Sequence, residues 1–117
     1  MALKVYGIKN CNTMTKAFGF LQEKGVEFEF IDYKKQKPSE ALLKEFLTKT
    51  NLPALVNKQG TTYRKMTDQQ KSDLEKVETA LPILTENSSM IKRPVIVYPD
   101  GSITLGFDPK EIEEKLV

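Results

Sequence analysis

The first 33 residues carry the pattern that most constrains the fold of this chain. Residues 3–8 form a short apolar run, and after a polar turn Met14, Phe18 and Leu21 recur at helical spacing. Residues 26–33 then alternate apolar and polar side chains, as a half-buried strand does. The pattern predicts a β-α-β unit, in which a right-handed crossover makes the two strands parallel.

A helical insertion is expected after this unit, over about residues 38–88. An apolar face at helical spacing follows the start signal Pro38-Ser39. Short helical patterns continue along the segment, and Thr67 and Gln70 stand at the spacing of a capping box. The insertion is therefore expected to be a group of short helices.

The end of the chain predicts a β-hairpin followed by a helix. Residues 95–97 form a buried apolar run, residues 99–101 have the composition of a turn, and residues 103–107 alternate as a second strand. Asp108 is the expected N-cap of a final helix over residues 110–116.

Together these elements predict an α/β, thioredoxin-like fold with a four-stranded mixed sheet. A single domain is expected over residues 1–117, because a chain of this length buries a core without disulfides or a structural metal. No segment reaches the run of about 18 apolar residues that spans a bilayer, and the N-terminus lacks the layout of a signal peptide. We therefore expect a cytoplasmic protein without membrane contact.

The chain has one cysteine, Cys11, and no histidine. A lone cysteine forms no internal disulfide, which agrees with a reducing compartment. Without histidine the chain cannot assemble the Cys/His sets that bind zinc, nor a Cys-His catalytic pair, so no metal and no tightly bound cofactor are expected. The 18 basic and 16 acidic residues are mixed along the chain, which argues against nucleic acid as a direct ligand.

Cys11 is predicted to lie in the turn between the first strand and the first helix, where open α/β sheets commonly bind ligands. Unpaired N–H groups at a helix start favour a thiolate, and cationic neighbours lower a cysteine pKa from about 8.5 to roughly 3.5–7.5. Lys9 is the nearest cation in the sequence. The alternative is that Cys11 is a small buried apolar residue. The polar neighbours Asn10, Asn12 and Thr13 favour an accessible nucleophile.

Only two of the basic residues are arginines, Arg64 and Arg93. Arginine suits planar recognition of an oxyanion or carboxylate, although a surface salt bridge is the alternative role for each. Arg93 precedes Pro94, which in a thioredoxin-like fold faces the turn at the end of the first strand, so Arg93 is expected to reach a ligand at Cys11. A dithiol motif would need a second cysteine where Met14 stands, so the partner thiol must come from another molecule.

Three segments carry a family resemblance: Tyr-Gly-Ile-Lys-Asn-Cys at residues 6–11, Gly-Thr-Thr-Tyr-Arg-Lys at 60–65 and Ile-Lys-Arg-Pro at 91–94. With them the chain resembles, over nearly its whole length, the bacterial arsenate reductase/Spx family of thioredoxin-like proteins, and most closely the YffB-like branch. That branch implies a glutathione-dependent thiol reductase. The resemblance places the family's catalytic cysteine at Cys11 and a family arginine at Arg93.

The resemblance also implies two alternative functions. One is an arsenate reductase linked to glutathione and glutaredoxin, in which three arginines hold the oxyanion. Of these only Arg93 is matched, because Asn57 and residues 106–107 occupy the other two places, and Gly7 stands where the family has a histidine. The other is an Spx-like regulator that binds RNA polymerase, but Met14 removes its two-cysteine switch.

We therefore expect a monothiol reductase. Its thiolate attacks an oxidised or mixed-disulfide substrate, and glutathione, as co-substrate, takes up the adduct. The predicted catalytic residues are Cys11 and Arg93, and the predicted substrate-binding or glutathione-binding residues are Lys9, Asn10, Asn12, Thr13, Arg64 and Pro94. Glutaredoxin or a thiol-oxidised molecule is the expected partner besides glutathione.

Overall fold

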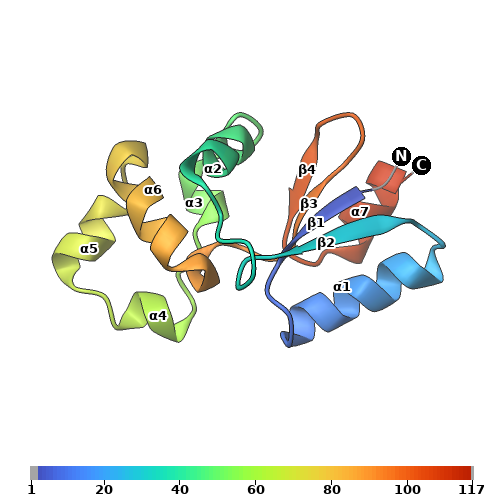
Figure 1. Cartoon of the computed structure of the whole chain (residues 1–117), viewed down its shortest axis with the longest axis horizontal. Helices are drawn as coiled ribbons and strands as arrows, with labels where there is room; N and C mark the ends of the chain where they lie inside the picture. The colour runs from blue at the N-terminus through green and yellow to red at the C-terminus, as the bar shows by residue number, and fades with distance from the viewer. Residues whose placement is uncertain (1–2, 117) are drawn as a thin grey trace. The chain divides into compact units, whose positions relative to one another are not determined.

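The computed structural model describes residues 3–116, and the chain divides into two compact units (Figure 1). The first unit joins the N-terminal residues up to Lys35 to the C-terminal residues from Arg93 onward, and the second is Gln36–Lys92. The insertion expected at about residues 38–88 falls inside the second unit. No helix within the described part of the chain is long and apolar enough to cross a membrane.

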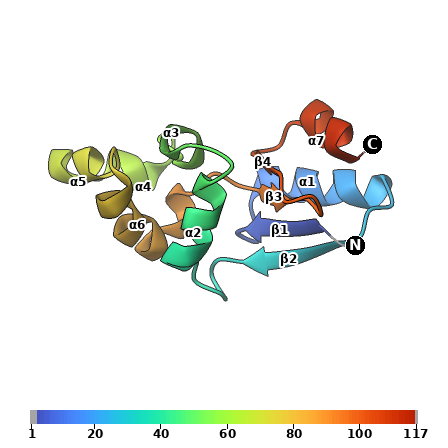
Figure 2. The same cartoon turned by 90° about the horizontal axis from the view of Figure 1, so that it is seen from above.

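A four-stranded mixed sheet forms the centre of the first unit, with strand order β2-β1-β3-β4 (Figure 2). The strands are β1 (Leu3–Gly7), β2 (Phe28–Asp32), β3 (Val95–Val97) and β4 (Ile103–Leu105). β1 pairs in parallel with β2, and β3 pairs antiparallel with both β1 and β4. The predicted parallel β-α-β unit, the hairpin and the thioredoxin-like α/β fold with a mixed sheet are confirmed.

Two helices cover one face of this sheet, α1 (Asn12–Glu23) and α7 (Pro109–Leu116) (Figure 2). The buried residues between helices and sheet are Leu3, Val5, Met14, Leu21, Ile96, Tyr98 and Ile112. Full burial of such aliphatic side chains contributes roughly 1.5–3 kcal/mol each. This packing holds α1 against β1 and so fixes the turn that joins them.

The turn of the hairpin and the start of the last helix form as their local sequences predict. Gly101 has a positive φ of 87° in the turn after β3, a conformation in which a side chain is strained. The Asp100 carboxylate accepts a hydrogen bond of 2.9 Å from the Ser102 N–H. At the start of α7 the Asp108 carboxylate accepts a hydrogen bond of 3.3 Å from the Glu111 N–H, as expected of an N-cap.

The second unit consists mainly of short helices. They are α2 (Glu40–Leu47), α3 (Leu52–Leu55), α4 (Thr61–Arg64), α5 (Asp68–Asp73), α6 (Val77–Glu86) and the 3₁₀ turn η1 (Ser88–Met90). α2 packs against α6, and the buried residues of the unit include Leu43, Phe46, Leu55, Leu81, Leu84, Met90 and Ile91. The predicted capping box is confirmed: Thr67 caps α5, and Gln70 returns a hydrogen bond to it.

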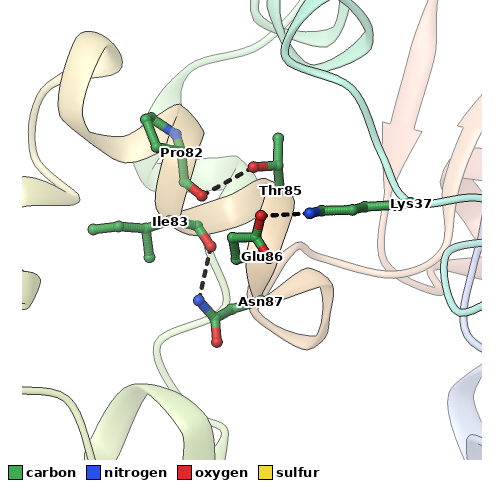
Figure 3. A network of polar contacts seen from close by, with 6 residues as sticks. All are labelled: Lys37, Pro82, Ile83, Thr85, Glu86 and Asn87. Atoms are coloured by element: carbon green, nitrogen blue, oxygen red, sulfur yellow. Dashed lines mark hydrogen bonds and ion pairs between the residues drawn. The ribbon is translucent and has the colours of Figure 1, made fainter.

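Side-chain contacts fasten the end of α6 (Figure 3). The Thr85 hydroxyl donates to the Pro82 carbonyl at 2.9 Å, the Asn87 amide donates to the Ile83 carbonyl at 2.9 Å, and Lys37 forms an ion pair with Glu86. The Ile83 carbonyl also accepts the Asn87 backbone N–H at 2.9 Å, so Asn87 binds the end of α6 through both its backbone and its side chain. Pro82, inside α6, has no backbone N–H to donate to the preceding turn.

Candidate functional site

The candidate site is the turn between β1 and α1. Asn10 has a positive φ of 67°, a conformation that asparagine tolerates better than most residues. It directs the chain so that Cys11 becomes the N-cap of α1, with an extended backbone (φ −116°, ψ 135°). The Cys11 carbonyl then accepts the first hydrogen bond of the helix, from the Thr15 N–H at 2.9 Å. The sulfur therefore lies at the start of α1.

The half-buried sulfur of Cys11 lies among hydrogen-bond donors. Partial burial raises the pKa of the thiol, but the Arg93 side chain, the backbone N–H groups of Met14 and Thr13 and the positive charge of Arg93 favour the thiolate. Together these favourable groups outweigh the effect of burial, so the Cys11 pKa lies below its ordinary value. The N–H groups of Thr13 and Met14 favour the thiolate although the side chain makes no regular N-cap hydrogen bond to α1.

Arg93 reaches this turn because β3 runs beside β1. Tyr6 pairs with Val95, which brings Arg93 next to the end of β1. A Cβ atom on Gly7 would lie 3.6 Å from the Arg93 Cβ. Pro94, which follows through a cis peptide bond, is buried beside the strand end. Cys11 and Arg93 thus come together although they lie far apart in the sequence.

The other residues that the sequence predicted for the site have different surroundings. Lys9, Asn10 and Asn12 are exposed, and Arg93, rather than Lys9, supplies the cationic effect on Cys11. Arg64 lies on α4 in the second unit, where its Nη2 donates a hydrogen bond of 3.0 Å to the Gln59 carbonyl. The roles of Lys9, Asn10, Asn12 and Arg64 in binding a substrate stay predictions.

Gly7 and Met14 form a contact that the sequence analysis missed. Met14 is completely buried, and its Sδ and Cε lie 2.5 and 2.6 Å from the place that a Cβ on Gly7 would occupy. The sequence placed Met14 on the apolar face of the first helix and at the position of an absent second cysteine, and it marked Gly7 as the position of an absent histidine, without linking the two. A glycine at a strand end marks a close approach of this kind, and the helical spacing already directed Met14 inward.

This arrangement can supply a nucleophile and a site for negative charge. A thiolate attacks disulfides and other electrophiles, and the adjacent guanidinium and N–H groups can hold an anionic group of the substrate. The chain has no histidine, so no imidazole transfers protons here. Among residues 3–116, no group of three or more cysteine or carboxylate side chains is placed to bind a metal ion.

Comparisons with known proteins agree over nearly the whole chain. The model of the ArsC family matches residues 6–115. A protein of Haemophilus influenzae, described as uncharacterized, is 40% identical over 111 residues, which cover 95% of this chain and 96% of that protein. A solved structure described as YffB (PA3664) protein has a TM-score of 0.91 and 34% identity, and the match covers 99% of this chain and all of that one.

A second solved structure that is similar to this chain is described as related to arsenate reductase. It is an arsenate reductase (ArsC) related protein from Brucella melitensis, with 36% identity and a TM-score of 0.75. The match covers 99% of this chain and 95% of that one. The likeness therefore spans the Cys11 turn as well as the helices of the second unit.

Proposed function

The chain belongs to the ArsC family, and we propose that it is a monothiol oxidoreductase that uses glutathione to reduce oxidised thiols. The observation that carries this proposal is the half-buried Cys11 sulfur, at the start of α1 and within reach of Arg93. Because Cys11 is the only cysteine in the chain, the second sulfur of any disulfide must come from another molecule. Glutathione is the small thiol that we propose for this role.

The reaction proceeds in two exchanges. The Cys11 thiolate attacks the glutathione sulfur of a mixed disulfide, the S–S bond of the substrate breaks, and the substrate leaves as a thiol after taking a proton from solvent. The Cys11–glutathione disulfide is then attacked by the thiolate of a second glutathione, which releases glutathione disulfide and restores the Cys11 thiolate. The sulfur of the second glutathione is oxidised, the substrate sulfur is reduced to a thiol, and the two glutathione sulfurs leave joined in one disulfide.

Positioning and charge supply most of the rate in this scheme. Arg93 stabilises the thiolate before attack and when it leaves again. It also binds an anionic group, such as a glutathione carboxylate, with Thr13 and Pro94 beside it. The exposed residues Lys9, Asn10 and Asn12 complete the proposed binding set.

The pKa of Cys11 is the measurement that tests this proposal most directly. We expect thiolate absorbance and the pH dependence of the alkylation rate to give one value, below the ordinary pKa. Incubation with glutathione disulfide is expected to add one glutathionyl group, seen by mass spectrometry, and this group is removed by glutathione. A pKa at or above about 8.5 contradicts the activated thiolate.

Turnover tests the role of glutathione itself. A glutathionylated peptide is offered with glutathione, and glutathione disulfide is measured through a coupled reductase. The wild-type protein is expected to accelerate the exchange and Cys11→Ala is not. Turnover with a protein dithiol but not with glutathione contradicts the proposed co-substrate.

Arsenate reduction is a second candidate, because the same thiolate and guanidinium suit a tetrahedral oxyanion and because a similar structure is described as arsenate reductase related. With only two arginines in the chain, and Arg64 bound to the Gln59 carbonyl, a three-arginine cradle cannot form. We therefore expect little arsenite from arsenate, glutathione and glutaredoxin. If arsenite forms as fast as the glutathionylated peptide is reduced, arsenate reduction becomes the better candidate function.

A further inference from the structure

The contact between Gly7 and Met14 joins the end of β1 to the first turn of α1. The Gly7 backbone cannot retreat easily, because Gly7 pairs with Asp32 and its carbonyl accepts a hydrogen bond of 2.8 Å from the Tyr33 N–H. Met14 has little room on its other side, since it is completely buried in the core that includes Leu21. The Met14 thioether therefore packs directly against position 7, and any residue larger than glycine at that position would collide with it.

The first turn of α1 also holds the donors that face Cys11. The backbone N–H groups of Thr13 and Met14 interact with the Cys11 sulfur. Met14 thus does two things: its side chain fixes the turn against Gly7, and its N–H faces the sulfur. A displacement of the side chain that shifts the first turn would also move this donor.

We propose that Gly7 and Met14 are a matched pair of positioning residues, which set where the first turn of α1 lies relative to the Cys11 sulfur. This inference rests on the proposed function, because it concerns the reactivity of the same thiolate. It assigns a role to the position at which a dithiol protein would carry its second cysteine. Here a methionine supports the thiolate through the backbone instead of attacking a disulfide.

Gly7→Ala is the first test. The φ of Gly7 is not in the positive range, so alanine is compatible with the backbone, and only the Met14 thioether opposes the new methyl group. We expect the substitution to move the first turn and raise the Cys11 pKa by about 0.5–1 unit. At a pH below both values the alkylation rate then falls roughly three- to tenfold.

Met14→Ala tests the same contact from the other side. We expect it to raise the Cys11 pKa as well, because the turn loses its support on Gly7. In the Met14→Ala background the Gly7→Ala substitution is expected to have no further effect on the pKa, since the two atoms that the methyl group would meet are gone. Equal effects of Gly7→Ala in both backgrounds overturn the matched pair.

Gly19→Ala is the matched control. Gly19 lies in α1, it is exposed, and a Cβ there would meet no atom within 4 Å. We expect this variant to fold with unchanged Cys11 pKa. A shift equal to that of Gly7→Ala shows that any added methyl group in this region changes the thiol, and overturns the proposal.

The outcomes separate this inference from the proposed function. An ordinary Cys11 pKa in the wild-type protein contradicts the proposed function. If the wild-type Cys11 pKa is lowered, and a folded Gly7→Ala or Met14→Ala variant has the same pKa, the result contradicts the positioning pair alone. If Gly7→Ala fails to fold, Met14→Ala still decides through its pKa, and recovery of folding in the double variant supports the pair.

Discussion

The start of α1, in the first unit, differs from the starts of α2 and α5, in the second unit, in what caps the helix. In the second unit, the Ser39 hydroxyl accepts the Leu42 N–H at 3.1 Å at the start of α2, and Thr67 and Gln70 exchange hydrogen bonds at the start of α5. In the first unit the N-cap of α1 is Cys11, which makes no such capping bond. The same helix position therefore holds a capping side chain in α2 and α5 and, in the proposed function, a reactive thiol in α1.

The two arginines repeat this difference. Arg64, in the second unit, is exposed and donates to a backbone carbonyl near its own helix. Arg93, in the first unit, is half-buried and interacts with the Cys11 side chain. Only in the first unit do the donor groups act on a cysteine, whose charged form is a nucleophile. Substitutions in the first unit should therefore change the Cys11 thiol, and substitutions in the second unit should not.

The largest effect is expected from Cys11→Ser. A serine hydroxyl is not a thiolate, so turnover of a glutathionylated peptide should fall to the level without protein. A serine oxygen is, however, a preferred N-cap, so the free energy of unfolding should rise by up to about 1 kcal/mol relative to Cys11→Ala. Urea unfolding of both variants measures this gain. Equal stability of the two variants would show that α1 does not accept a capping oxygen.

Substitution of Arg93 should have the next largest effect. Hydrogen bonds to charged groups contribute about 1.5–3 kcal/mol, so Arg93→Ala should slow the reaction of Cys11 roughly 10- to 100-fold below neutral pH and raise its pKa. Arg93→Lys should lie between alanine and wild type, because it keeps the charge but loses the planar fork. Lys110→Ala, which removes an exposed cation of the same unit, is the control for net charge. An unchanged pKa in Arg93→Ala would break the distinction between the two arginines.

Loss of a cap in the second unit should change stability alone. Ser39→Ala and Thr67→Ala should each lower the free energy of unfolding by about 1 kcal/mol, because an N–H at the helix start loses its acceptor. The Cys11 pKa should stay at its wild-type value. Thr67→Ser keeps the hydroxyl and should lose much less. Chemical denaturation and thiol titration of the same samples measure both quantities, and a shifted pKa would contradict the separation of roles.

The smallest expected effect is a pH dependence of stability. The Cys11 pKa is lower in the folded than in the unfolded chain, so the thiolate stabilises the fold at high pH. The stability of wild type relative to Cys11→Ala should rise as pH increases through the folded pKa, and should level off above the ordinary thiol pKa. Below the folded pKa the stability of wild type relative to Cys11→Ala should no longer change with pH. Denaturation of both proteins at several pH values tests the sign, and a difference that falls with rising pH would be the wrong sign for a lowered pKa.

Local signals were enough to predict most of the first unit. The apolar run of β1, the alternation in β2, the turn at Gly101 and the cap at Asp108 depend on residues close in sequence, and they were found correctly. The strands β2 and β4 are shorter than the alternation predicted, because pairing partners exist only along Phe28–Asp32 and Ile103–Leu105. The alternation marks side-chain direction, whereas a strand ends where its neighbour ends.

The second unit and the exact site were harder to predict. The division of residues 51–87 into α3 to α6 depends on contacts between distant residues, such as the bridge between Val56 and Ile91. In the site, the position of Cys11 follows from the turn, but the support of Met14 on Gly7 is a packing contact across seven residues. Sequence patterns indicate which face is buried and do not show which atoms meet there.

The first unit is assembled from both ends of the chain, and this has a consequence for its biosynthesis. β1 cannot pair with β3, nor Cys11 meet Arg93, until the ribosome has added the segment after Lys92. A nascent chain that stops before Arg93 therefore exposes a cysteine without its guanidinium. The thiol should therefore acquire its full acidity only when translation is nearly complete and Arg93 can meet Cys11.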